Sequence, residues 1–339
     1  MTKRRVTLQD IADNFNVTRV SVSKAINNQP GISEELRKRI LNFAFETGYM
    51  KANGQKSANA DSFAFLVQHR FYMENENFYS VIFNNLNSIC QAKGKRLQLF
   101  VVDPEAIDNS MLNQLNKSSI DGIFIGGEVS EKLLHMLKNL GIPIVYIDFN
   151  NHHIRNDCIL VDNFSISYIA TNYLIDQGHT RIGFVGNGFT SSNVMDRYYG
   201  YRKALSSSNL EFREEWLLNN YDGNTGYYSL DFAVPIEMPT AFVCHCDMSA
   251  YFLIHRLTLM GLKVPDHISI ISFDNTLLAE TSSPPLTSVD ISKKEFAVAA
   301  YNMLNSRILH PKSDVRQVLI NTKIVERESV KRFISGIEE

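Results

Sequence analysis

Apolar residues recur with a helical period in three short stretches of the first fifty residues. The pattern predicts a first helix across positions 8–15, a second from Arg19 to about Asn27, and a third over Glu34–Glu46. Each helix has one face that can be buried, and together the three faces make a very small core. These faces consist of Leu8, Ile11, Ala12 and Phe15, then Val22, Ala25 and Ile26, then Leu36, Ile40 and Phe43.

Polar residues before each stretch favour the same three helices. Thr7 is followed three residues later by Asp10, the spacing of a capping box. Thr18 and Ser33 are placed to cap the second and third helices, and Gly48 is placed to end the third. Three such helices in this order are typical of a helix-turn-helix unit, whose second helix enters the DNA major groove.

The second helix carries side chains suited to DNA. Arg19 and Val20 stand at its N-terminal end, where side chains reach base edges, and its hydroxyl and ammonium groups suit bases or phosphates. A generic three-helix bundle with a solvated polar face is the simpler alternative. The predicted DNA-contacting set is Thr7, Thr18, Arg19, Val20, Ser21, Ser23, Lys24, Asn27, Lys51 and Lys56.

Charge is distributed unevenly along the chain. Residues 1–56 hold ten Lys/Arg and five Asp/Glu, a net +5, whereas the remaining 24 basic and 31 acidic residues give −7. A basic head on an acidic body is the electrostatic layout of a DNA-binding domain joined to another domain. The charge pattern therefore favours a nucleic-acid partner over the simpler helical bundle.

Beyond a small, polar stretch at 51–60, strand-like apolar runs alternate with helical patterns. This alternation predicts an α/β fold with parallel sheets that helices cover on both faces, and the length fits two sheets. The predicted strands are 63–67, 97–102, 122–125, 144–147, 159–161, 182–185, 241–244, 268–273 and 287–289. The predicted helices are 78–93, 131–140, 165–177, 197–207, 248–262 and 292–308.

Composition narrows the class of protein. The chain of 339 residues is 44% hydrophobic and 21% charged, opens without an apolar leader and has no run long enough to span a membrane, so we expect a cytoplasmic protein. Cys244 and Cys246 lack the second pair of a zinc site, and we interpret them as structural cysteines on a buried strand. His152 and His153 suit a surface loop. No metal or cofactor is expected.

Family resemblance rests on motifs that occur in order along nearly the whole chain. The segments are Val6–Ala12, Val17–Thr18, Ser21–Asn27, Ser33–Glu35, Gly48–Tyr49, Gly178–Phe184, Arg197–Tyr201, Gly261–Pro265, Ile270–Asp274 and Pro284–Thr287. They resemble the lactose/galactose repressor family of bacterial transcription regulators, whose body is similar to periplasmic sugar-binding proteins.

The resemblance implies a domain layout. A helix-turn-helix headpiece occupies residues 1–50 and a hinge 51–61. The effector-binding and dimerisation core occupies 62–339, with an N-lobe at about 62–162 and 291–321 and a C-lobe at about 163–290 and 322–339. Ligand is expected in the cleft between the lobes, at the carboxyl ends of the strands.

The resemblance also implies effector-binding residues. Arg197 matches a family guanidinium that reaches into the cleft, Asp274 a cleft acid, and Tyr221 an aromatic that can stack on a sugar ring. Ordinary core packing for the aromatics and a structural salt bridge for Arg197 and Asp274 are the alternatives. The full predicted set is Phe71, Phe78, Tyr79, Asp148, Arg197, Tyr221, Cys246, Asp247 and Asp274.

Two departures from the family pattern affect the expected function. Cys246 stands where the family often has an amide that binds effector, and Asp247 is expected to serve as N-cap of a helix starting at Met248. After the headpiece, Gly54 and a small residue near the family's leucine wedge predict a weaker hinge helix. Lys51 and Lys56 would then contribute phosphate contacts.

The expected function is a ligand-responsive DNA-binding repressor of carbohydrate-utilisation genes that a sugar releases. Co-repression by a purine or nucleoside, or control by a protein partner, is the alternative. The chain ends without apolar heptads, so a homodimer on a pseudo-palindromic operator is expected. The glycine-rich run Gly183–Gly188 lacks the spacing of nucleotide-binding loops, and no catalytic motif is evident, so no enzymatic activity is expected.

Overall fold

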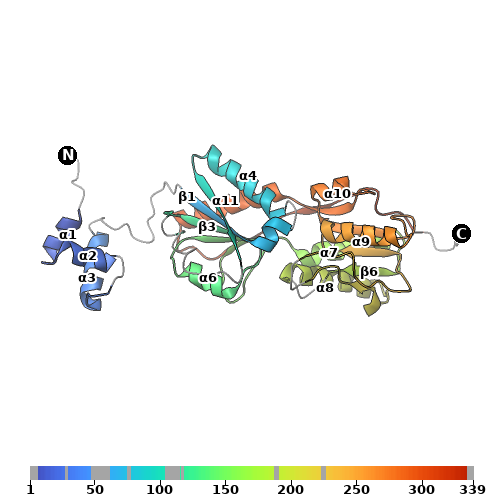
Figure 1. Cartoon of the computed structure of the whole chain (residues 1–339), viewed down its shortest axis with the longest axis horizontal. Helices are drawn as coiled ribbons and strands as arrows, with labels where there is room; N and C mark the ends of the chain where they lie inside the picture. Colours follow the sequence, from blue (N-terminus) through green and yellow to red (C-terminus); the bar gives the residue numbers. More distant parts are fainter. Residues whose placement is uncertain are drawn as a thin grey trace. The chain divides into compact units, whose positions relative to one another are not determined.

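The computed structural model describes residues 7–26, 30–46, 62–74, 78–103, 115, 118–186, 191–222 and 227–333. The described headpiece residues, 7–26 and 30–46, contain α1 (Leu8–Asn14), α2 (Arg19–Ile26) and α3 (Glu34–Glu46) (Figure 1). Phe15 meets Phe43 edge to face at 5.4 Å between ring centroids. The fully buried residues of its small core are Ile11, Ala12, Val22, Ala25, Ile40 and Ala44.

The predicted caps of all three headpiece helices are confirmed. Thr7 and Asp10 form a complete capping box, in which the Thr7 amide donates to Asp10 Oδ2 at 2.7 Å. Thr18 Oγ1 accepts from the Ser21 amide at 3.1 Å, and Ser33 Oγ accepts from the amide three residues later at 3.3 Å. These bonds satisfy amides that have no partner inside their own helix.

Removing the first cap is expected to loosen α1. Thr7→Ala deletes the hydroxyl, which costs about 1 kcal/mol and should accelerate amide exchange in α1 roughly fivefold. Hydrogen exchange on the full chain measures this, with Thr7→Ser as the matched control because serine keeps the capping oxygen. Equal exchange rates in the alanine variant and the parent would show that the box does not stabilise the helix.

The body, residues 62–333, contains two six-stranded sheets (Figure 1). The first is wholly parallel, and its strand order is β11-β5-β4-β3-β1-β2. Its strands are β1 (Ser62–Gln68), β2 (Arg96–Val102), β3 (Gly122–Gly126), β4 (Ile144–Ile147), β5 (Asp157–Leu160) and β11 (Gln317–Leu319).

The second sheet has the corresponding order β12-β10-β9-β8-β6-β7. Its edge strand β12 runs antiparallel to β10, and its other pairs are parallel. The strands are β6 (Ile182–Val185), β7 (Leu217–Leu218), β8 (Ala241–Cys244), β9 (Ser269–Asp274), β10 (Thr287–Ile291) and β12 (Thr322–Val325). The chain passes between the sheets after β5, after β10 and between β11 and β12, so three segments join them.

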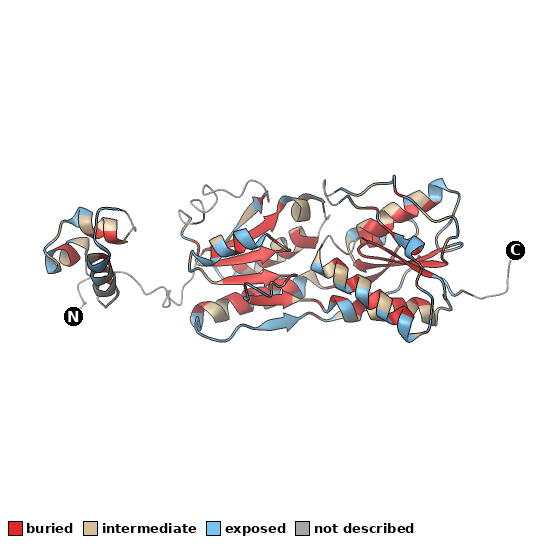
Figure 2. Cartoon of the chain, turned by 90° about the horizontal axis from the view of Figure 1, so that it is seen from below, coloured by how far each residue is buried: buried red, intermediate tan, exposed pale blue. Residues whose placement is uncertain are grey.

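Helices cover both faces of the first sheet, as the residues of β1 illustrate. Phe63 meets Tyr301 of α11 (Lys293–Leu309) at 6.3 Å, and Phe65 meets Phe83 of α4 (Phe78–Ala92) at 5.6 Å. The alternating β1 residues belong to the opposite core, which includes leucines of α6 (Glu131–Lys138). Figure 2 shows this buried centre under partly exposed helices. The predicted α/β class is therefore confirmed.

The second sheet is accompanied by α7 (Asn163–Asp176), α8 (Ser192–Ser207), α9 (Asp247–Leu259) and α10 (Leu277–Thr281). A short π turn, η1 (Arg70–Glu74), follows β1, and a 3-10 turn, η2 (Glu214–Trp216), precedes β7. The sequence pattern starts α8 five residues too late, because Ser191 caps the helix and accepts from the Val194 amide at 3.4 Å. The short elements β7, β11, β12 and α10 were not predicted.

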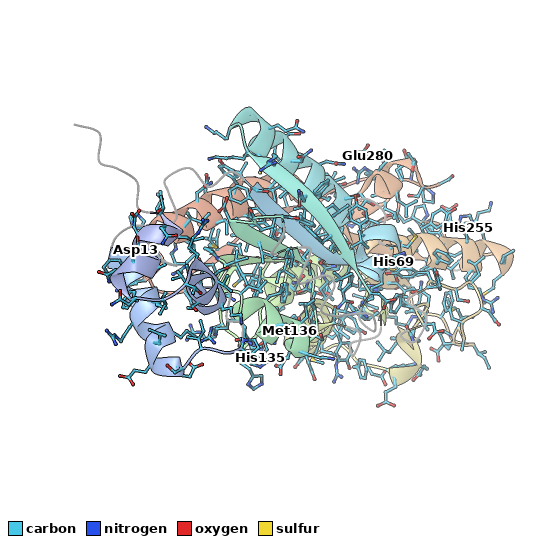
Figure 3. All side chains as sticks on the ribbon, turned by 60° about the vertical axis from the view of Figure 1, so that its left-hand side comes forward. Asp13, His69, His135, Met136, His255 and Glu280 are labelled. Atoms are coloured by element: carbon cyan, nitrogen blue, oxygen red, sulfur yellow. The ribbon has the colours of Figure 1, made fainter. Side chains whose placement is uncertain are left out.

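Among the described residues, no helix is both long and apolar enough to cross a membrane. No group of three or more His, Cys, Asp or Glu side chains in the described part of the chain is arranged to hold a metal ion. His69, His135 and His255 lie on separate segments of the body (Figure 3). His152 and His153 are both exposed, as predicted.

Candidate ligand cleft and nucleic-acid interface

One cleft in the body is lined by segments that follow strands of both sheets, together with the first turns of α4, α8 and α9. Its cavity volume is about 110 Å³. All nine predicted effector-binding residues line it, namely Phe71, Phe78, Tyr79, Asp148, Arg197, Tyr221, Cys246, Asp247 and Asp274.

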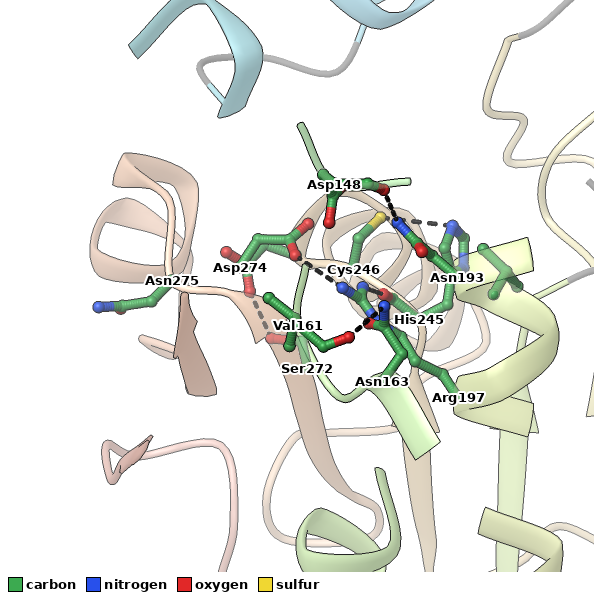
Figure 4. Close-up of polar contacts among 12 residues, drawn as sticks. Asp148, Val161, Asn163, Asn193, Arg197, His245, Cys246, Ser272, Asp274 and Asn275 are labelled. Carbon is green, nitrogen blue, oxygen red and sulfur yellow. Dashed lines mark hydrogen bonds and ion pairs between the residues drawn. The ribbon is translucent and has the colours of Figure 1, made fainter. Parts of the chain in front are cut away.

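Arg197, on the first half of α8, lies at the floor of the cleft and is only 5% exposed. Its Nε donates to Asn163 Oδ1 at 2.8 Å, and its Nη1 donates to the His245 carbonyl. Its Nη2 pairs with Asp274 Oδ1 at 3.3 Å, as Figure 4 shows. The guanidinium therefore joins three separate segments, and the structural salt bridge that the sequence left open is present alongside the cleft position.

Asp148 follows β4 on the opposite wall, and Asp274 ends β9. These two strands occupy the same place in the orders of their sheets, so each sheet delivers one acid to the cleft. Both acids have left-handed backbone, with φ of 66° and 93°. Aspartate tolerates this region better than most residues, which fits the tight turns needed to leave the strands.

The carboxyl of Asp148 is 5% exposed, and its Oδ2 accepts from the Tyr79 hydroxyl at 2.8 Å. Burial raises the pKa of Asp148 to about 7, although Arg197 and the Tyr79 hydrogen bond act in the opposite direction. The same burial, together with Asp148, raises the pKa of Tyr79 well above its ordinary value. Asp148 Oδ1 has no hydrogen-bond partner among the described residues.

Aromatic rings form much of the cleft wall. On one side, the ring of Tyr79 lies 5.6 Å from Phe71 and 5.1 Å from Phe78. On the other, Tyr221 meets Tyr228 at 5.1 Å. Flat apolar faces beside acidic acceptors suit either a sugar ring or a heteroaromatic base.

The structure corrects the interpretation of Cys246 and Asp247. Cys246 does not lie on a strand: β8 ends at Cys244, and Cys246 is the N-cap of α9, where its Sγ accepts from the Ser249 amide at 3.4 Å. The helix thus begins at Asp247, which is not its cap. The reason is that the Asp247 carboxylate accepts hydrogen bonds from hydroxyl and amide donors of neighbouring elements instead of from its own helix. They belong to Ser272 (2.6 Å), Ser288 (2.7 Å) and Thr276 (2.7 and 2.9 Å).

Several cleft residues were missed from the sequence. Tyr228 places its hydroxyl 3.1 Å from both His245 Nε2 and Cys246 Sγ, so a phenol is available near the position of the missing amide. Burial lowers the pKa of His245 to about 4 and raises that of Cys246 to about 12, which leaves both groups neutral. These contacts join residues far apart in the sequence, and no local pattern signals them.

Two hydrogen bonds cross the cleft from the first turn of α8 to segments of the first sheet. Asn193 Nδ2 donates to the Asp148 carbonyl at 2.8 Å, and the Ser192 amide donates to Glu128 Oε2 at 3.3 Å. Arg197 lies on the same helix, so α8 connects the ligand-facing guanidinium directly to the opposite wall. A ligand that binds between these groups can therefore change the orientation of the two sheets relative to each other.

In the headpiece, the start of α2 presents a mixed polar and apolar surface. Thr18 and Arg19 are exposed, and Val20 is 63% exposed although it is apolar. Ser21, Ser23 and Lys24 are half-buried beside the core residue Val22, which fixes the helix in the unit. Thr7 is exposed and engaged in its capping box. The remaining predicted DNA contacts, Asn27, Lys51 and Lys56, lie outside the described residues, as does the hinge.

Comparison with known proteins extends the resemblance. The family of bacterial regulatory proteins of the lacI type matches residues 7–51, and a periplasmic binding protein-like domain matches residues 171–330. The chain is 30% identical over 337 residues to the HTH-type transcriptional repressor PurR of Vibrio campbellii, with 96% of this chain and 99% of the relative covered. Identity to PurR of Histophilus somni is 29% over 331 residues, with the same coverage.

Solved structures agree on the fold. The complex of the transcriptional regulator CelR with cellobiose superposes with a TM-score of 0.68 at 22% identity, covering 96% of this chain and 100% of that one. Full-length coverage means that the headpiece and both sheets have counterparts in that protein.

Proposed function

Because the chain belongs to the lacI family of bacterial regulatory proteins and is a ligand-responsive, DNA-binding transcriptional repressor, we propose that its ligand is a sugar. Sugar binding in the cleft releases the repressor from the operators of carbohydrate-utilisation genes. The observation that carries this proposal is the pair of acids, Asp148 and Asp274, on opposite sides of an aromatic-lined cleft. Carboxylates accept hydrogen bonds from sugar hydroxyls, and the rings cover the apolar face of a pyranose.

Calorimetry of the full-length protein with a panel of monosaccharides and disaccharides tests the ligand class. We expect one sugar to bind with a measurable heat and to weaken operator binding in parallel. Purine bases and nucleosides belong in the same panel, since the PurR relatives favour a purine co-repressor as the second candidate. A purine that binds and tightens operator binding would replace the sugar; no heat with any small ligand would favour a protein partner.

On DNA, we propose that two copies place their headpieces on the two halves of a pseudo-palindromic operator in the cytoplasm. One headpiece buries too little surface for tight specific binding, and pairing raises the affinity through effective concentration. Ligand in the cleft then changes the relation between the sheets and, through it, the spacing of the headpieces. Sedimentation is expected to give a dimer at micromolar protein, and a stable tetramer would contradict this arrangement.

Arg19 is expected to read a base. Arg19→Ala should weaken binding to the best operator by about 1–3 kcal/mol and relax the preference at one base position, because a guanidinium recognises a base edge by paired hydrogen bonds. Competition binding against single-base operator variants measures both effects. Arg39→Ala on α3 removes the same charge from another exposed position and serves as the control. An equal loss of affinity on every sequence would make Arg19 a phosphate contact.

A further inference from the structure

Two of the described polar side-chain atoms that line the cleft differ from the rest because they are buried without a hydrogen-bond partner. Among the described lining residues, Asp148 Oδ1 and Arg70 Nε are the buried side-chain atoms without a hydrogen-bond partner. Most buried polar atoms in folded proteins are paired, and an unpaired one raises the free energy of the folded state. A ligand that supplies a donor to Asp148 and an acceptor to Arg70 would satisfy both atoms.

The cations near Asp148 are committed to other partners. Arg197 directs its three donor nitrogens to Asn163, His245 and Asp274. Lys293 donates to the Asp274 and Asn275 carbonyls. The Arg70 guanidinium lies over the ring of Phe71, at 4.5 Å from its centroid. The structure therefore pairs Asp274 directly with a guanidinium, whereas Asp148 makes no ion pair among the described residues and its Oδ2 accepts from the Tyr79 hydroxyl.

The charged side chains on the cleft walls are mainly acidic, which also favours a cationic ligand. Four carboxyl groups and two guanidinium groups line the cleft, the acids being Glu128, Asp148, Asp247 and Asp274 and the bases Arg70 and Arg197. Among the aromatic side chains of this wall, Tyr79 hydrogen-bonds Asp148, and Phe71 and Phe78 pack against the ring of Tyr79. A carboxylate with an unpaired oxygen recognises an ammonium group by a charge-assisted hydrogen bond.

Resting on the proposed function, we infer that the sugar is an amino sugar, whose ammonium group binds Asp148 Oδ1. A ring hydroxyl next to the ammonium accepts from Arg70, and the remaining hydroxyls donate to Asp274. Figure 4 shows Asp148 on the opposite side of the cleft from Arg197 and Asp274, so one ring spans the two acids. The Asp148–ammonium pair then distinguishes this ligand from a neutral hexose of the same shape.

Calorimetry with three matched series of probes tests this inference at pH 7.0 on the full-length protein. Each series contains a hexose, its 2-amino-2-deoxy derivative and the N-acetyl form of that derivative, taken from glucose, galactose and mannose. We expect one amino sugar to bind roughly tenfold or more tightly than both its hexose and its N-acetyl form, because a charge-assisted hydrogen bond contributes that ratio.

Two variants test whether the Asp148 carboxylate causes the preference for the amino sugar over its hexose. Asp148→Asn should bring the affinities of the amino sugar and its hexose to within about twofold, since the amide keeps the shape and backbone preference but not the charge. Asp231→Asn, which removes an exposed carboxylate outside the lining of the cleft, should keep the preference. Equal loss in both variants would show a general electrostatic effect and overturn the assignment to Asp148.

The outcomes separate this inference from the proposed function. Binding of a neutral hexose as tight as that of its amino derivative overturns the amino sugar and leaves a sugar-released repressor in place. Binding of purines alone, or of no sugar, overturns the proposed function and the inference with it.

Discussion

Replacing Arg197 by alanine is expected to abolish the response to ligand and to lower the free energy of unfolding of the body by about 3–5 kcal/mol. The side chain is buried and holds Asn163, the His245 carbonyl and Asp274 together. Its removal leaves the Asp274 carboxylate without its ion-pair partner and opens a gap against the ring of Phe273, whose centroid lies 4.7 Å from the guanidinium carbon. Loss of a buried charge partner is costly because the remaining charge is poorly solvated.

Denaturant unfolding and operator release by the ligand measure the two effects separately. Lys203→Ala on the exposed side of the same helix is the matched control and should change neither. Arg197→Lys should recover part of the stability but not the response, since an ammonium group cannot reproduce the fork of donors. Operator binding in the absence of ligand should persist, because the headpiece has its own core. A normal ligand response in the alanine variant would contradict the assignment of Arg197 to the cleft machinery.

Asp148 is expected to make the stability of the body depend on pH. The carboxyl has an ordinary pKa of 3.8 when unfolded, and burial raises its folded pKa to about 7. Between these values the folded state binds the additional proton, so the contribution of Asp148 to stability falls as the pH rises and is constant above about 7. In Asp148→Asn this dependence is absent, and asparagine also accepts the left-handed backbone at this position.

The stability of Asp148→Asn relative to the parent should therefore increase by about 3 kcal/mol between pH 5 and pH 8. Denaturant titrations at several pH values measure this difference, in which the contributions of Asp247, His245 and the other buried groups largely cancel. Asp231→Asn, which alters an exposed carboxyl, should show a difference that is constant with pH. A constant difference for Asp148→Asn as well would mean that its carboxyl is ionised in the folded protein at pH 5.

Local sequence signals specified much of the fold. The hydroxyl caps Thr7, Thr18 and Ser33 and the apolar stripes behind them gave the headpiece helices, with α3 confirmed at both ends. Apolar runs gave the ends of β4, β6 and β8 as well, because buried parallel strands must be apolar on both faces. Short edge elements such as β7 and β11 carry too few residues for a pattern.

The cleft was predictable only in part. The family motif placed Arg197 and Asp274, and the ends of parallel strands placed Asp148, since these ends meet at one side of a sheet. Tyr228 and the partners of Asp247 were not predictable, because their hydrogen bonds join residues up to 41 positions apart. Cys246 was misplaced because a thiol is rarely an N-cap, and only the structure shows its contact with the Ser249 amide.

The central claim, that the chain represses transcription by placing two headpieces on a specific operator, is tested most directly by selection of bound sequences from random duplex DNA. Purified full-length protein is the reagent, without added ligand. We predict enrichment of a pseudo-palindrome whose half-sites are related by the two-fold symmetry of a dimer. Salt-sensitive binding to all sequences, with none enriched, would contradict the account of a sequence-specific repressor that binds before its ligand arrives.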